Sequence, residues 1–122
     1  NKLMNRKVPL RIRKLMKEFK EGLIRIYGDR LKAVYLYGSY ARGDYRAGSD
    51  VDVMILLNKY NKTYWDEIER TSELISNISL EYNAHVSRIL MTEEKWKRSD
   101  TPLLRNIHRE GQPAWMNVQV NF

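Results

Sequence analysis

The sequence has 122 residues, of which 43% are hydrophobic, and this is enough for one compact domain but hardly for two. It contains no cysteine, which excludes disulfides and thiolate metal sites and favours oxygen ligands, and with them Mg²⁺ over Zn²⁺. No apolar stretch approaches the roughly 18 residues of a membrane-spanning helix, so we expect a soluble, cytoplasmic protein with no membrane partner.

The net charge of +7 is concentrated in residues 1–30, where ten Lys or Arg face only three acidic residues. The rest of the chain is neutral overall. Such a basic segment can be a nucleic-acid surface or only the solvated face of a helix, and we favour the solvated face.

Apolar residues recur every three or four positions from Leu10 to Tyr27, which predicts a helix with one apolar stripe. Pro9 suits its first turn, and Gly28 suits its end because glycine adopts the left-handed conformation at little steric cost. Residues 1–9 are expected to form a flexible segment, and the sequence leaves open whether residues 1–3 are native.

Strands and a second helix are expected in the middle of the chain. β-Branched and aromatic residues predict strands at Ala33–Tyr37, Val51–Leu57 and Ala84–Met91. Residues 38–49, rich in Gly, Ser, Asp and Arg, are expected to form a loop or a brief helix. A helix is predicted over Lys62–Ser79, with an apolar stripe formed by Trp65, Ile68, Ser72, Ile75 and Ile78.

The last third of the chain predicts two short helices and an edge strand. Thr92 can cap a helical turn, and Thr101 with Pro102 can begin a further helix that carries Leu103, Leu104 and Ile107 on one side and ends before Gly111. Ala114–Met116 could add an edge strand. We therefore expect an α/β (α+β) domain over residues 10–116, in which a small mixed sheet packs against helices, followed by a tail over residues 117–122.

Two acidic residues open the predicted strand Val51–Leu57. Residues two apart on a strand project to the same side, so Asp50 and Asp52 are expected to aim both carboxylates at one point. Two like charges held close need a cation, and a hard divalent ion accepts carboxylate oxygens while leaving positions for phosphate oxygens. Asp50 and Asp52 are therefore predicted to bind Mg²⁺.

A glycine and a serine end the preceding strand. Gly38 lets the backbone approach a phosphate without a Cβ in the way, and the Ser39 hydroxyl is a further donor. Arg42 has a planar guanidinium that matches phosphate oxygens, and Ser49 lies in the same loop. Gly-Ser and Asp-x-Asp are each common on their own. Here Gly-Ser ends one predicted strand and Asp-x-Asp opens the next, and this combination indicates a nucleotide site.

The complete pattern is Gly38-Ser39, ten residues, then Asp50-x-Asp52, with Ala-Arg-Gly after Tyr40. It resembles the DNA polymerase β superfamily of nucleotidyltransferases, and in length and element order it is most similar to the minimal nucleotidyltransferases encoded beside HEPN-domain proteins. The resemblance implies a polymerase-β-like fold and catalytic roles for Ser39, Asp50 and Asp52. It further implies an antitoxin that transfers AMP from ATP to a tyrosine hydroxyl of a partner HEPN ribonuclease.

The sequence departs from the superfamily pattern at one position. A third carboxylate is expected on a later strand, but residues 84–91 contain no Asp or Glu, and His85 or Ser87 stands nearest, with Glu81 a further candidate. This departure keeps a rival open, a catalytically weak module that blocks a HEPN partner sterically. A second rival is a nucleic-acid-binding regulator using the basic first helix, although direct nucleic-acid binding is not our expectation. Base preference and the acceptor residue stay open.

Overall fold

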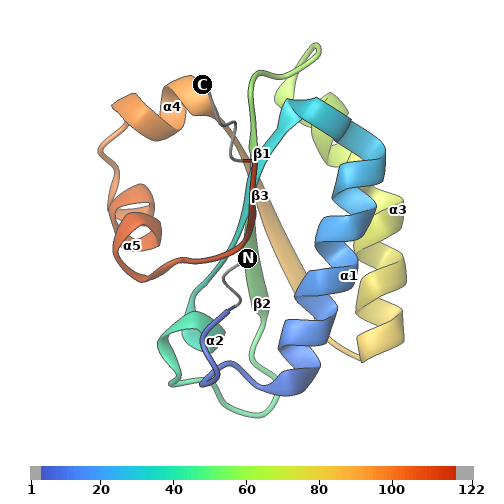
Figure 1. Cartoon of the computed structure of the whole chain (residues 1–122), viewed down its shortest axis with the longest axis vertical. Helices are drawn as coiled ribbons and strands as arrows, with labels where there is room; N and C mark the ends of the chain where they lie inside the picture. Colours follow the sequence, from blue (N-terminus) through green and yellow to red (C-terminus); the bar gives the residue numbers. More distant parts are fainter. Residues whose placement is uncertain (1–3, 118–122) are drawn as a thin grey trace, which may run out of the picture.

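A four-stranded sheet separates two layers of helices in the computed structural model, which describes residues 4–117 (Figure 1). The strands are β1 (Leu31–Tyr37), β2 (Val51–Leu57), β3 (Val86–Thr92) and β4 (Gln112–Met116). Their order is β3-β2-β1-β4, with β1 antiparallel to both β2 and β4 and with β2 parallel to β3. The sheet is mixed, as predicted, and β4 is the expected edge strand.

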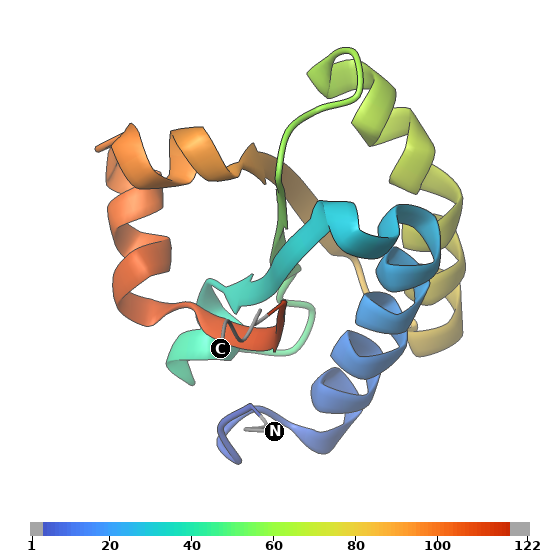
Figure 2. The ribbon, with the colours of Figure 1, turned by 45° about the horizontal axis from the view of Figure 1, so that its top comes forward.

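The helices lie on both faces of the sheet. The long helices α1 (Leu10–Tyr27) and α3 (Tyr64–Tyr82) cover one face, and the shorter α4 (Glu93–Arg98) and α5 (Pro102–Glu110) cover the other (Figures 1 and 2). A single 3₁₀ turn (Gly28–Arg30) precedes β1, and the four-residue helix α2 (Ser39–Arg42) follows it. This arrangement leaves the junction between β1 and α2 beside the layer that contains α5.

Helix α1 has the predicted bounds, because the signals at both of its ends are strong. Its buried stripe comprises Ile12, Leu15, Met16, Phe19, Leu23 and Tyr27. Pro9 occupies the capping position rather than the first turn, and Gly28 adopts a φ of 56° where the helix ends. Val8, just before the helix, is fully buried in the same core.

Strand β2 has the predicted bounds and is buried on both faces. Val51, Val53, Ile55 and Leu57 belong to the core under α1 and α3. Met54 and Leu56 belong to a second cluster, which contains Leu104 and Ile107 of α5. This second cluster fixes α5 against the sheet.

Helix α3 differs from its prediction at both ends and in its buried face. It begins at Tyr64 because Thr63 and Asp66 form a reciprocal capping box, and it continues to Tyr82 because Asn83 supplies the left-handed terminating residue, with a φ of 48°. Trp65 was predicted in the apolar stripe, but it is 74% exposed. The buried positions of α3 are Glu67, Thr71 and Ile78.

Smaller differences affect three strands and one helix. Strand β4 begins at Gln112, two residues earlier than predicted. Strand β1 begins at Leu31, two residues earlier than predicted, and β3 begins at Val86 because the Ala84 N–H still bonds to the Ser79 carbonyl at the end of α3. Thr92 and Thr101 cap α4 and α5 as expected. Leu103, however, was predicted on the apolar side of α5 and is 43% exposed.

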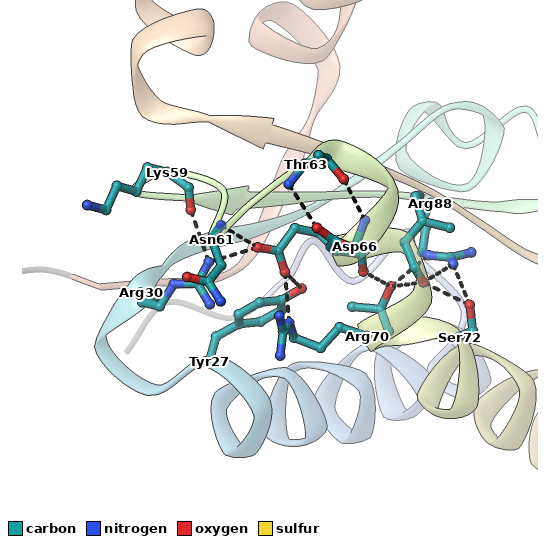
Figure 3. A network of polar contacts seen from close by, with 12 residues as sticks. Tyr27, Arg30, Lys59, Asn61, Thr63, Asp66, Arg70, Ser72 and Arg88 are labelled. Carbon is teal, nitrogen blue, oxygen red and sulfur yellow. Dashed lines mark hydrogen bonds and ion pairs between the residues drawn. The ribbon is translucent and has the colours of Figure 1, made fainter.

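A buried carboxylate ties α3 to the corner between α1 and β1. The Glu67 side chain is fully buried and accepts hydrogen bonds from the Tyr27 hydroxyl (3.0 Å), Arg30 (2.8 Å), Arg70 (3.0 Å) and the Asn61 N–H (2.8 Å) (Figure 3). Burial raises the pKa of Glu67, but these hydrogen bonds outweigh it and hold the pKa below its usual value. The carboxylate is therefore satisfied entirely by the protein.

Within residues 4–117, no helix is both long enough and apolar enough to span a membrane. Residues 1–3 and 118–122, which include parts of the predicted N-terminal segment and C-terminal tail, lie outside the described residues.

Candidate active site

The antiparallel pairing of β1 and β2 brings together the two motifs that the sequence separates. Tyr37, the last residue of β1, pairs with Asp52 of β2, so Gly38 emerges beside the Asp52 side chain. A pocket of about 400 Å³ lies at this junction. It is lined by all six predicted site residues, Gly38, Ser39, Arg42, Ser49, Asp50 and Asp52, and also by Tyr37, Leu103, Asn106 and Glu110.

Both the backbone and the surroundings of position 38 favour glycine. Gly38 is buried and has a φ of +78°, and a Cβ at this position would collide with the Asp52 carboxylate. The missing side chain therefore lets the chain turn directly over the acidic pair. Ser39 follows as the first residue of α2, and Arg42 is the last.

Asp50 and Asp52 have different surroundings. Asp50 directly precedes β2 and is exposed, and its Oδ1 lies 3.0 Å from Nδ1 of His85. Asp52 lies within β2 and is half-buried. Burial raises the pKa of Asp52, the charge of Asp50 raises it further, and Arg42 and His85 offset part of the effect.

This carboxylate pair fits a hard divalent cation. Burial and the charge of Asp50 both disfavour the ionised form of Asp52, a bound cation would offset this penalty, and Mg²⁺ prefers oxygen ligands. Among residues 4–117, no three His, Asp or Glu side chains gather into a metal-binding group. Asp50 and Asp52 would supply two of the roughly six ligand positions of Mg²⁺, with phosphate oxygens and water as natural further ligands.

The strand next to Asp52 carries a hydroxyl where a third carboxylate was expected. Ser87 of β3 pairs with Asp52 in the parallel register, and His85 lies one residue before β3 and contacts Asp50. Glu81, the other candidate, lies exposed on α3 near Glu18 and does not line the pocket. His85 and Ser87 are therefore the residues of this segment beside the acidic pair.

Two predicted phosphate-binding residues have protein partners. Arg42 donates to Asp44 (3.2 Å) and to Glu110 (3.0 Å). The Ser49 hydroxyl accepts a hydrogen bond from the Arg46 N–H (2.8 Å) and so closes a turn in the loop before Asp50. Ser49 thus shapes the loop in addition to lining the pocket.

Helix α5 contributes pocket residues that sequence reasoning missed. Leu103, Asn106 and Glu110 are three and four positions apart, so they share one face of the helix. Leu104 and Ile107 occupy the neighbouring face and are buried in the core. The spacing of these three residues indicates from the sequence that they share a helix face. Only the sheet order shows that this face lies beside the end of β1.

Comparison with known proteins identifies the family of this chain. Residues 16–112 match the family described as the nucleotidyltransferase domain. The chain belongs to this nucleotidyltransferase family. The match covers most of the described chain and includes both halves of the pocket, so the membership predicted from the Gly-Ser and Asp-x-Asp pattern is confirmed.

Two relatives come from Methanocaldococcus jannaschii, and both are provisionally named protein adenylyltransferases. One is 40% identical over 81 residues, which make up 66% of this nucleotidyltransferase and 80% of the relative. The other is 32% identical over 100 residues, which make up 81% of this chain and 93% of the relative.

Solved structures share the fold of this nucleotidyltransferase. A provisionally named nucleotidyltransferase from Sulfolobus solfataricus has a TM-score of 0.60 at 21% identity, covering 92% of this chain and 89% of that one. A toxin-antitoxin structure with AMP-PNP has a TM-score of 0.54 at 22% identity, covering 81% of this chain and 72% of that one. The predicted polymerase-β-like fold is confirmed.

Proposed function

We propose that this nucleotidyltransferase binds ATP together with Mg²⁺ in the pocket at the end of β1 and transfers AMP to a hydroxyl group of a partner protein. The observation that carries the proposal is that Gly38 and Ser39 line the same pocket as Asp50 and Asp52. The provisional names of the two relatives support a protein acceptor, and the AMP-PNP in the toxin-antitoxin structure supports an adenine nucleotide.

Each of the six predicted site residues has a role in this proposal. The Gly38 N–H, the Ser39 hydroxyl and the Arg42 guanidinium would donate to phosphate oxygens, and Asp50 and Asp52 would hold the metal ion. When bound, Mg²⁺ neutralises phosphate charge and orients the triphosphate. Ser49 would keep the loop before Asp50 in place through its bond to Arg46.

The transfer forms one bond and breaks one. The acceptor oxygen bonds to the α-phosphorus, and the bond from that phosphorus to the oxygen bridging to the β-phosphate breaks, so pyrophosphate leaves. The hydroxyl proton goes to a base beside the carboxylates, for which His85 is the candidate, at 3.0 Å from Asp50.

A tyrosine of a HEPN ribonuclease is the proposed acceptor, and this modification would make the chain an antitoxin. A phenol, with a pKa of about 10, ionises more readily than an alkyl hydroxyl, so it needs a weaker base. That suits a site in which Ser87, rather than a carboxylate, pairs with Asp52. The family resemblance supports the choice of partner, and the toxin-antitoxin fold relative supports the antitoxin role.

The test is intact-mass spectrometry of the HEPN partner before and after incubation with this protein and Mg²⁺-ATP. The wild type should add AMP to the partner and abolish its ribonuclease activity, and the double variant Asp50→Asn/Asp52→Asn should do neither.

Ser87 in the place of a third carboxylate also favours a second candidate, a module that blocks its partner without modifying it. That candidate predicts an inhibited partner of unchanged mass, with the double variant as effective as the wild type. This result would overturn the transferase proposal.

A further inference from the structure

The carboxylate of Glu110 lies inside the proposed phosphate-binding part of the pocket. Glu110 is the last residue of α5 and lies 72 positions from Gly38 in the sequence. Its Oε2 accepts one hydrogen bond from the Gly38 N–H (2.9 Å) and another from Arg42 (3.0 Å). The side chain is 14% exposed, so the carboxylate is largely withdrawn from solvent.

These two donors are the groups that a phosphate would use. A glycine N–H beside an open backbone and a guanidinium fork are typical phosphate-binding groups, and a carboxylate oxygen accepts charge-assisted hydrogen bonds from them in the same way. Gly38 and Arg42 therefore hold an anion, and that anion is part of the protein.

Helical preference does not account for a glutamate at this position. The C-terminal end of a helix carries partial negative charge from its free carbonyl groups, so it favours cations such as the preceding His108 and Arg109 and disfavours a carboxylate. The contacts with Gly38 and Arg42 offset this unfavourable position. The position of the carboxylate is thus stabilised by hydrogen bonds from the pocket and not by its own helix.

While the carboxylate remains, the Gly38 N–H and one Arg42 N–H are occupied and cannot bond to a triphosphate. Each N–H bond that Glu110 receives is one that a phosphate oxygen would need, and the pocket already contains the charges of Asp50 and Asp52. Mg²⁺ would offset the charges of Asp50 and Asp52, but it would leave the Glu110 carboxylate facing the phosphate oxygens, and these like charges repel. Binding therefore requires the Glu110 side chain to leave.

We propose that Glu110 is a positioning residue that holds the place of a phosphate in the nucleotide-free protein and is displaced by the incoming triphosphate. This inference rests on the proposed nucleotide site. Until the nucleotide arrives, the carboxylate keeps the Gly38 N–H and the Arg42 guanidinium directed at one point. It also competes with the ligand, so the affinity of the site for nucleotide is lower than its donors alone would give.

The test compares Glu110→Gln with Asp44→Asn. Both variants remove one negative charge that bonds to Arg42, but Asp44 does not bond to Gly38 and its side chain is 65% exposed. The dissociation constant of Mg²⁺-AMP-PNP is measured by calorimetry for each variant and for the wild type. Because a charge-assisted hydrogen bond no longer competes, Glu110→Gln should bind about tenfold more tightly than wild type. Asp44→Asn should bind as the wild type does.

Other outcomes count against the inference. If the wild type binds nucleotide and Glu110→Gln binds equally well, Glu110 does not compete with phosphate. If Glu110→Gln binds more weakly, Glu110 instead stabilises the nucleotide complex. If Asp44→Asn binds nucleotide as tightly as Glu110→Gln does, the gain in affinity comes from the lost negative charge and not from the place of Glu110. If Glu110→Gln does not fold, Glu110→Asp, whose shorter side chain withdraws the carboxylate, should also bind more tightly. If the wild type binds no nucleotide, the proposed function and this inference both fail.

Discussion

Two clusters of charged side chains lie at opposite ends of β1, and their carboxylates differ in burial and in hydrogen bonding. Beside Arg30, which precedes the strand, Glu67 is fully buried and receives four hydrogen bonds from the protein. After the strand, Asp50 and Asp52 line an open pocket, in which Arg42 is already bonded to Asp44 and Glu110.

The pKa shifts of the two clusters have opposite signs for a physical reason. Around Glu67, hydrogen bonds outweigh burial and lower the pKa. At Asp52, burial and the charge of Asp50 raise the pKa, with too little positive charge nearby to reverse the shift. The protein itself compensates the charge of Glu67, whereas a cation bound in the pocket would offset the penalty on Asp52.

The largest expected effect on stability is at Glu67. Glu67→Ala removes the acceptor for the Tyr27 hydroxyl and the Asn61 N–H and separates two arginines from their partner. It should lower the free energy of unfolding by about 3 kcal/mol. Chemical denaturation measures this, with Glu69→Ala on the exposed side of α3 as the control. A loss below about 1 kcal/mol, the worth of a surface pair, would contradict a structural role for the cluster.

The same substitution has a signed pH dependence. Because folding lowers the pKa of Glu67, its contribution is present at neutral pH and is lost as the pH falls through the lowered value. The stability gap between wild type and Glu67→Ala should therefore narrow in acid. The affinity of the folded variant for nucleotide should not change, since this cluster lies away from the pocket.

The next effect separates two glycines that both have a positive φ. Gly38 and Gly48 both have positive φ values, +78° and +82°, so an alanine at either position should be strained by about 1–3 kcal/mol. Only at Gly38 does the new Cβ strike the Asp52 carboxylate. Gly38→Ala should therefore weaken Mg²⁺-AMP-PNP binding by about a hundredfold, roughly 2.7 kcal/mol, and Gly48→Ala far less. Equal losses in the two variants would mean that the close approach of Gly38 to Asp52 is not what the site needs.

A smaller effect is expected at Ser39. Removing its hydroxyl deletes one hydrogen bond to a charged phosphate, which contributes about 1.5 to 3 kcal/mol, so Ser39→Ala should weaken nucleotide binding about tenfold or more. Ser76→Ala on the exposed surface of α3 is the control for the assay. Wild-type affinity in Ser39→Ala would place the phosphates elsewhere.

The smallest effect is a gain in stability at Asp52. Because folding raises the pKa of Asp52, its ionised form is penalised in the folded protein at neutral pH. In the presence of a chelator, Asp52→Asn should therefore melt a few degrees above the wild type. The difference should shrink as the pH falls toward the ordinary aspartate value of 3.8. A melting temperature below that of the wild type would show that the protein already balances this carboxylate.

The sequence predicts some parts of the molecule well, because their determinants are local. Helix α1 and strand β2 have the expected bounds, since an uninterrupted apolar pattern meets a clear stop at each end. The approach of Gly38 to the acidic residues was also foreseeable, because only ten residues separate Ser39 from Asp50 between two adjacent strands.

Other parts depend on contacts that no local pattern encodes. Trp65 fits the helical period but faces solvent, because period alone does not fix which side of α3 meets the core. Glu67 resembles an ordinary polar helix residue until its partners from α1 and the neighbouring loop are in place. Glu110 reaches Gly38 only because the second core cluster fixes α5 beside the end of β1.

The most direct test of the account is calorimetric titration of AMP-PNP into the wild type and into Asp50→Asn/Asp52→Asn, each with Mg²⁺ and with a chelator. If the acidic pair exists to hold a metal for the nucleotide, binding should occur only in the wild type with Mg²⁺, while thermal unfolding shows that the double variant remains folded. Equal affinity in the double variant, or equal affinity in the wild type with the chelator, would contradict the metal-dependent nucleotide site.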